Sequence, residues 1–255
     1  MTTYLTTPQG RHIAYHQTPG KGPGVVFLGG FRSDMTGAKA LHLEAWAQAT
    51  GHAFLRFDYS GHGQSHGSFV DGSISDWRDD AAAVIDTLTE GPQVLVGSSM
   101  GGWIALLLTR DMPERVAALI GIAAAPDFTE RMWEAEFSPA QRAELLAEGV
   151  FLRPSAYAAE PYPITLRLIE DGRRNLVLQS PLILPVPVRL LQGTVDVDVP
   201  PQVALMLLDH AQGPDIRLTM VKGADHRFSS PDCLALLTET IDSLLANRSA
   251  TAAGN

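Results

Sequence analysis

Short runs of consecutive apolar residues alternate along the chain with longer segments in which apolar residues recur every three or four positions. Runs such as GVVFLGG (24–30) and QVLVG (93–97) are typical of strands buried on both faces of a parallel sheet. The longer period is typical of helices packed on such a sheet. This alternation predicts an α/β fold with a mostly parallel central sheet and helices on both faces.

The elements can be placed by residue range. The expected strands are 3–6, 11–17, 24–30, 52–58, 93–97, 115–125, 188–193 and 215–221, of which the first two form an N-terminal hairpin. The expected helices are 38–50, 76–90, 201–211 and 231–246, with a further helix that begins near Met100. Each of these helices lies between two strands or after the last one, as a parallel sheet requires.

The alternation stops between residues 126 and 187. This segment contains two amphipathic helical stretches (127–137 and 138–149), followed by proline-rich and aromatic sequence near YAAEPYPITL (157–166). Its content of Leu, Ile, Phe and Trp is too high for a solvated linker. The pattern therefore predicts one domain over residues 1–248 with a small helical cap inserted at about 126–187, and a flexible tail at 249–255.

Composition excludes several classes of protein. With 28 acidic and 19 basic residues the formal charge is −9, and no cluster of Lys and Arg suggests a nucleic-acid partner. The one cysteine cannot form an internal disulfide. No apolar stretch reaches the ~20 residues needed to cross a bilayer, and no targeting segment is recognised. We therefore expect a soluble, cytoplasmic protein, whose oligomeric state the sequence leaves open.

Candidate chemistry begins with VGSSMGGWIALLL (96–108), where an expected strand meets an expected helix. Gly97 to Gly101 fits the G-x-S-x-G pattern with Ser99 at its centre. A sharp turn of this kind exposes the central hydroxyl, and the small residues on either side let strand and helix pack closely. Small residues also occur where a chain only needs a tight connection, so the nucleophile hypothesis requires a base and an acid elsewhere.

Two later loops supply them. Asp196 lies in GTVDVDVP directly after the strand at 188–193, and His226 lies in GADHRF after the strand at 215–221. The order Ser, Asp, His, each following a sheet strand, is the order that a nucleophile elbow of this type predicts for its triad partners. Asp198 in the same turn is the main alternative acid, and Asp225 a weaker one because it adjoins the histidine.

His226 alone follows a late strand and precedes the final helix, unlike the seven other histidines: His12, His16, His42, His52, His62, His66 and His210. His62 and His66, in GHGQSHG, are four residues apart, a spacing at which two histidines on one face of a helix can bind a metal. The stretch is too rich in glycine for a helix and lacks further ligands at suitable spacing. We therefore expect no metal and no cofactor, and a turn beneath the site instead.

An acyl-transfer site also needs hydrogen-bond donors for the developing oxyanion. The backbone amide of Met100 directly follows Ser99. A second amide is expected from LGGFRSD, after the strand at 24–30, where Phe31 follows a glycine pair that allows close approach to substrate. These two amides are the predicted oxyanion hole.

From Tyr4 to about Leu245 the sequence resembles the α/β-hydrolase superfamily, through LGGF, RFDYSGHGQS, VGSSMGGW, GTVDVDVP and GADHRF. Family members commonly have His-Gly-x at Gly29 to Phe31, so this chain lacks that histidine. Within the superfamily, FRSDMTGAKA, GSSMGGW and RVAALIGIAAAPDF look like the abhydrolase-domain group of palmitoyl-protein thioesterases and acyl-glucuronide esterases. The resemblance implies an esterase or thioesterase.

The resemblance also implies that the inserted segment covers Ser99 and shapes the substrate pocket. Its aromatic and methionine side chains are the candidate pocket residues, although such side chains are more often packing residues: Phe128, Met132, Trp133 and Tyr162. Trp103, one turn into the helix after Ser99, is interpreted as a core residue.

The sequence therefore predicts a serine hydrolase that cleaves carboxylic esters or thioesters of small acyl substrates through an acyl-enzyme. The same triad would also support carbon–carbon bond hydrolysis or perhydrolysis, and the scaffold could serve a ligand-binding protein without turnover. Acyl length, leaving group and natural substrate stay open at this point.

Overall fold

The computed structural model describes residues 2–154 and 161–253 and is built around an eight-stranded sheet. The strand order is β1-β2-β4-β3-β5-β6-β10-β12, in which β1, β2 and β4 are antiparallel neighbours and the rest are parallel. Its strands are β1 (Thr3–Thr6), β2 (His12–Thr18), β3 (Lys21–Leu28), β4 (His52–Phe57), β5 (Gln93–Ser98), β6 (Val116–Ile122), β10 (Val188–Gly193) and β12 (Ile216–Val221). The predicted mostly parallel sheet is confirmed.

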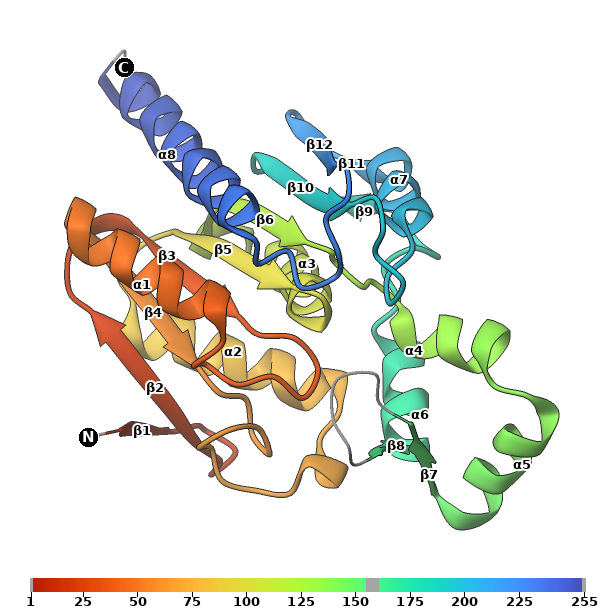
Figure 1. Ribbon diagram of the computed structural model, residues 1–255. Helices are drawn as coiled ribbons and strands as arrows, with labels where there is room; N and C mark the ends of the chain where they lie inside the picture. Colours follow the sequence, from red (N-terminus) through yellow and green to blue (C-terminus); the bar gives the residue numbers. More distant parts are fainter. Residues whose placement is uncertain (1, 155–160, 254–255) are drawn as a thin grey trace.

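Helices cover both faces of the sheet (Figure 1). The helices that connect or follow the strands are α1 (Ala38–Thr50), α2 (Ile74–Leu88), α3 (Met100–Asp111), α7 (Pro201–His210) and α8 (Pro231–Ala253). Successive side chains of one strand point to opposite faces of the sheet. In β3, Val25 packs against α1 and α8, whereas Val26 packs against α2 and α3. This alternation is the reason that the buried strands read as uninterrupted apolar runs.

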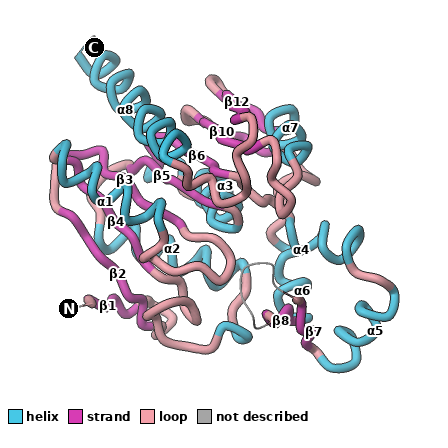
Figure 2. Tube along the Cα trace, viewed as in Figure 1, coloured by secondary structure: helices cyan, strands magenta, loops and turns pink. Residues whose placement is uncertain are grey.

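The segment between β6 and β10 leaves the sheet, although these two strands pair directly. Figures 1 and 2 show its first part as a separate lobe beside the carboxyl ends of the strands. Its elements are α4 (Phe128–Arg131), a π-helical turn η3 (Met132–Glu136), α5 (Pro139–Glu148), β7 (Val150–Arg153), β8 (Tyr162–Thr165), α6 (Leu166–Arg174) and β9 (Leu182–Ile183). The first two helical stretches match the prediction, with the first divided between α4 and η3. The antiparallel β7–β8 pair and α6 were not predicted.

The sequence analysis did not predict α6, because its sequence, LRLIEDGRR, contains a glycine and several charged residues. Gly172 is required by packing, since a Cβ there would lie 2.1 Å from the Oγ1 of Thr129.

The remaining elements are short: the 3-10 turns η1 (Phe69–Asp71) and η2 (Pro113–Arg115), and β11 (Ala211–Gln212), which pairs with β9. At the other end, α8 continues past the expected end at residue 246 to Ala253. No helix in the described ranges combines the length and apolar character needed to span a bilayer.

Candidate active site

Ser99 lies at the turn between β5 and α3, with φ 55° and ψ −118°. Few residues other than glycine adopt a positive φ, and holding one there costs about 1–3 kcal/mol. The backbone is fixed by its neighbours: the Ser99 amide donates to the carbonyl of Ile122, and its carbonyl accepts from Gly102 and Ala125. The turn therefore presents the Ser99 side chain to a pocket, which the buried residue Ser98 also lines.

Two glycines make this turn possible. A Cβ on Gly97 would lie 2.3 Å from the carbonyl oxygen of Gly101, and a Cβ on Gly101 would lie 2.1 Å from the carbonyl oxygen of Leu28. Because both obstacles are backbone atoms, neither can move aside without shifting β3 or α3. The G-x-S-x-G spacing thus has a steric cause in this fold.

His226 and Asp196 lie in adjacent loops at the carboxyl ends of β12 and β10. Nδ1 of His226 is 2.9 Å from Oδ2 of Asp196, whose side chain is fully buried. Asp196 also accepts hydrogen bonds from Gln192 and from the backbone amides of Asp198 and Val199. Burial raises the pKa of Asp196, but the hydrogen bonds from His226 and Val199 outweigh it and hold the pKa below its ordinary value. Asp196 is therefore an ionised partner for the imidazole.

The two alternative acids take other positions. Asp198 is half-buried beside the pair, and its carbonyl accepts a hydrogen bond from Arg131. Asp225 accepts from the Phe228 amide at 3.2 Å, and no hydrogen bond joins it to the His226 ring in the described residues. Atoms of Asp196, Asp198 and His226 able to bind a metal lie within 4.8 Å of one another. Since Nδ1 of His226 is already bonded to Asp196, hydrogen bonding accounts for the closeness of these two.

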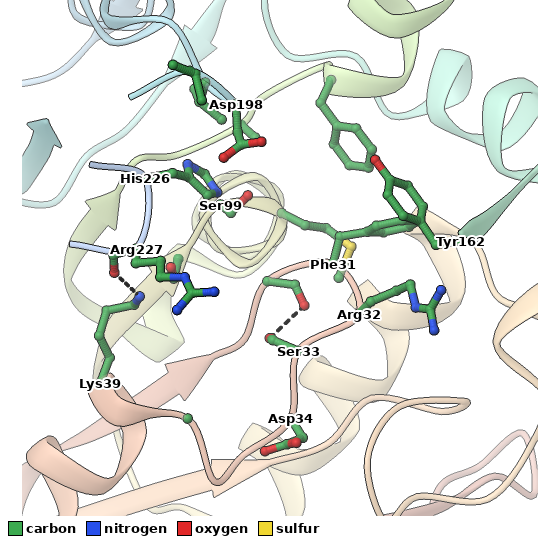
Figure 3. Close-up of a pocket in the computed structure, with 18 of the residues that line it drawn as sticks. Phe31, Arg32, Ser33, Asp34, Lys39, Ser99, Tyr162, Asp198, His226 and Arg227 are labelled. Carbon is green, nitrogen blue, oxygen red and sulfur yellow. Dashed lines mark hydrogen bonds between the residues drawn. The ribbon is translucent and has the colours of Figure 1, made fainter. Parts of the chain in front are cut away.

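Ser99 and His226 line the same pocket, of about 890 Å³. Figure 3 shows the imidazole of His226 directed toward the Ser99 side chain. Phe31 and Met100 line this pocket as well. Met100 is the first residue of α3, where backbone amides lack helical acceptors, and among the described residues the Phe31 amide donates to no other group. The predicted nucleophile, base and amide donors are thus brought to one place.

Three of the four candidate pocket residues of the cap also line the pocket: Phe128, Met132 and Tyr162. The ring of Phe31 packs against Phe128 and Tyr162 with centroid distances of 5.6 and 5.9 Å. Trp133 does not line the pocket. Its ring contacts the guanidinium groups of Arg142 and Arg173, whose Cζ atoms lie 5.6 and 5.0 Å from the ring centroid. Trp133 is one residue from Met132, and the turn of the helix directs it away from the pocket.

His62 and His66 do not form a metal pair. His62 is buried among Tyr59, Phe69 and Trp77, with ring centroids 5.0–5.6 Å away. Burial lowers the pKa of His62 to about 4, so this side chain is neutral at physiological pH. His66 instead packs against Tyr4 and His12. The glycine-rich loop that contains both histidines turns at Gly61 and Gly63, which both have positive φ.

Charged pocket residues were missed by sequence reasoning. They are Arg32, Asp34, Lys39, Arg131, Glu136, Arg153 and Arg227. They are scattered through five segments and form no run of like charge, so the only available signal was that Arg32 adjoins Phe31 and Arg227 adjoins His226.

The chain matches the model of the family described as serine aminopeptidase, S33, over residues 24–158. It is 38% identical to the mitochondrial palmitoyl-protein thioesterase ABHD10 of Rattus norvegicus, over 95% of this chain and 82% of the relative. The identity to ABHD10 of Homo sapiens is 36%, over 95% of this chain and 79% of the relative. The relatives are thioester hydrolases by name.

Solved structures agree with this relationship. A protein from Agrobacterium vitis S4 described as a hydrolase superposes with a TM-score of 0.91 at 42% identity, covering 96% of this chain and 98% of that chain. Mouse α/β hydrolase domain-containing protein 10 superposes with a TM-score of 0.89 at 36% identity, covering 97% and 99%.

The predicted cytoplasmic location is wrong by the same comparison. The relatives from rat, cattle and mouse, matched over 95% of this chain, are named as mitochondrial proteins. A single cysteine and the lack of a recognised targeting segment were the basis of that prediction, and the names of these relatives contradict it. The fold, the family match and the relatives agree on class: the chain belongs to the α/β-hydrolase family and is a serine hydrolase.

Proposed function

We propose that this protein hydrolyses carboxylic esters or thioesters of small acyl substrates through a triad of Ser99, His226 and Asp196. The observation that carries the proposal is the convergence, in one pocket, of a strained serine and a histidine held by a buried carboxylate. Three segments that are far apart in the chain supply these groups, and each follows a strand of the sheet. The thioesterase names of the relatives support including thioesters.

In the proposed reaction, Nε2 of His226 accepts the hydroxyl proton as Oγ of Ser99 attacks the carbonyl carbon. The carbonyl oxygen gains a negative charge, which the amides of Phe31 and Met100 stabilise. The tetrahedral intermediate collapses when the imidazolium returns the proton to the departing alcohol or thiol. Asp196 keeps Nδ1 protonated and stabilises the imidazolium by its charge.

Water completes the cycle. His226 removes a proton from a water molecule, which attacks the acyl-enzyme carbonyl. The second intermediate releases a carboxylic acid and regenerates the Ser99 hydroxyl. One ester or thioester bond and one water molecule are consumed, and no redox step occurs.

The test compares neighbouring serines. Ser99→Ala should lower kcat for p-nitrophenyl butyrate by about 10³-fold or more and abolish labelling by a fluorophosphonate probe. Ser98→Ala is the matched control and should retain both. Equal loss in the two variants would contradict the assignment, and a folded wild-type protein that neither labels nor hydrolyses would favour a ligand-binding role.

The substrate class needs a second comparison. Hydrolysis of matched oxygen and sulfur esters, cleavage of a dienoate ketone and formation of a peracid from hydrogen peroxide should be assayed side by side. The proposal expects turnover of esters or thioesters to exceed that of the other two. Faster carbon–carbon cleavage or perhydrolysis would replace it with one of the alternative reactions of the same triad.

A further inference from the structure

The pocket around Ser99 is rich in cations although the chain as a whole has a formal charge of −9. Its basic residues are Arg32, Lys39, Arg131, Arg153 and Arg227, and its acidic residues are Asp34, Glu136 and Asp198. Glu136 already accepts ion pairs from Arg131 at 3.1 Å and Arg153 at 2.7 Å. The excess of positive charge points to an anionic group on the bound substrate.

The chemistry divides this pocket into two sides. His226 must return a proton to the departing group, so the alcohol or thiol lies on the His226 side of Ser99. The acyl group then extends the other way. Figure 3 shows Phe31, Tyr162 and Arg32 on the side of Ser99 opposite His226, whereas Lys39 and Arg227 lie near His226. Arg32 is therefore a cation of the acyl side.

The acyl side begins apolar and ends charged. Next to the oxyanion loop, Phe31 packs with Phe128 and Tyr162 and offers a wall for methylene groups. Arg153 is the register partner of Tyr162 in the β7–β8 pair, so both side chains project from the same face of that ribbon. Burial raises the pKa of the Tyr162 hydroxyl, and the charges of Arg153 and Arg32 partly offset this rise. An acyl chain that lies along this wall would therefore extend toward Arg32 and Arg153.

Arg32 is the cation whose donors are least committed. Its guanidinium lies over the ring of Phe69, 5.5 Å from the centroid, and no carboxylate among the described residues pairs with it. In the part of the chain that the structure describes, the Arg32 guanidinium donates to no other side chain or carbonyl, so its N–H groups are available to a carboxylate. Arg32 also has a positive φ of 57°, a strained conformation that is found at functional sites.

From this arrangement we infer that Arg32, supported by Arg153, binds a carboxylate at the far end of the acyl group. The preferred substrates are then half-esters or half-thioesters of dicarboxylic acids, with an apolar chain between the reacting carbonyl and the anion. This inference rests on the proposed function, because it takes Ser99 as the nucleophile. Arg32 directly follows Phe31, so the backbone that holds the oxyanion also sets the distance to the carboxylate.

The test uses two esters with the same number of carbons. Mono-p-nitrophenyl adipate ends in a carboxylate, and p-nitrophenyl hexanoate ends in a methyl group. The wild-type protein should prefer the adipate by about tenfold or more in kcat/KM, since a hydrogen bond to a charged group is worth at least that much. The preference should shrink as salt is added, because Arg32 is exposed.

Three variants locate the effect. Arg32→Met should lower kcat/KM far more for the adipate than for the hexanoate and so remove the preference, and Arg32→Lys should restore part of it. Arg217→Met is the control, since Arg217 is an exposed residue of β12 that pairs with Asp215. It should leave both rates unchanged. Equal loss on both esters in Arg32→Met, or a wild-type preference for hexanoate, would overturn the inference.

A final pair of substrates separates the two sides of the pocket. Hexanoyl coenzyme A carries its anions on the leaving group, and hexanoyl-N-acetylcysteamine lacks them. If Arg32→Met slows only the coenzyme A ester, the arginine serves the leaving group and the acyl-side assignment is wrong. If hexanoate turnover survives Ser99→Ala, the proposed function itself fails. If hexanoate is hydrolysed through Ser99 but the adipate is not preferred, the proposed function stands and only the inference about Arg32 is wrong.

Discussion

Nδ1 of His226 hydrogen-bonds to Oδ2 of Asp196 at 2.9 Å, across two loops that follow parallel strands paired in the sheet. The other carboxylate oxygen accepts the amides of Asp198 and Val199, at 3.0 and 2.9 Å. The carboxylate therefore cannot rotate without losing backbone hydrogen bonds. This contact fixes the imidazole with its Nε2 edge toward Ser99.

Asp196→Asn should preserve the fold and lower kcat for p-nitrophenyl butyrate by about 10³–10⁴-fold. The amide cannot stabilise an imidazolium and can favour the wrong tautomer of His226. Asp198→Asn is the matched control in the same turn and should lose less than about tenfold. A larger loss of kcat in Asp198→Asn than in Asp196→Asn would show that Asp198 is the carboxylate partner of His226 in catalysis.

The stability of the fold at low pH depends on His62 as well as on Asp196. His62 is buried, and burial lowers its pKa to about 4. Between pH 4 and about 6.5 the unfolded chain binds a proton there that the folded chain does not, so the free energy of unfolding falls as the pH falls. This residue should contribute a loss of about 3 kcal/mol across that window.

Urea unfolding of wild type and His62→Leu at several pH values measures this contribution. Burial also raises the pKa of other groups, such as Asp58 and Asp127. Their contribution to the pH dependence is the same in both proteins and cancels in the comparison. The variant should lose less stability on acidification. Parallel pH profiles for the two proteins would show that His62 is protonated as readily in the folded state as in the unfolded chain.

Gly101→Ala should destabilise the fold by at least about 3 kcal/mol, because the new Cβ would lie 2.1 Å from the carbonyl oxygen of Leu28. Thermal unfolding and soluble yield provide the measurement. Gly37→Ala is the control, because Gly37 has a φ of −61° and a Cβ there would meet the carbonyl oxygen of Asp34 at an ordinary 3.6 Å. Similar melting temperatures for Gly101→Ala and wild type would mean that the turn relaxes without cost.

Phe128 and Trp133 should behave differently although both belong to the cap. Phe128→Leu should change the dependence of kcat/KM on acyl-chain length, since its ring lines the pocket beside Phe31. Trp133→Leu should leave that dependence unchanged and affect only stability, since its ring stacks with arginines. A series of p-nitrophenyl esters distinguishes them, and a shifted optimum in Trp133→Leu would place its side chain in the substrate path.

Much of this protein could be predicted from sequence because its strongest signals are local. The period of apolar residues identified the strands and helices of the sheet, and turn chemistry identified Ser99 within G-x-S-x-G. The carboxyl ends of parallel strands share one edge, so the positions of Asp196 and His226 after late strands were enough to predict their approach. In each case short-range backbone geometry leaves few alternatives.

The tertiary structure alone decided what surrounds those residues. Contacts between segments that no local pattern encodes determine the direction of Trp133, the β7–β8 pair and which of Asp196 and Asp198 hydrogen-bonds to His226. The cation-rich pocket belongs to the same class, because Arg32 and Arg153 line one pocket only when the cap has folded beside the sheet. Long side chains are placed by packing and charge at a distance, and for that reason the sequence specified the reaction class while the fold specified the shape and charge of the pocket.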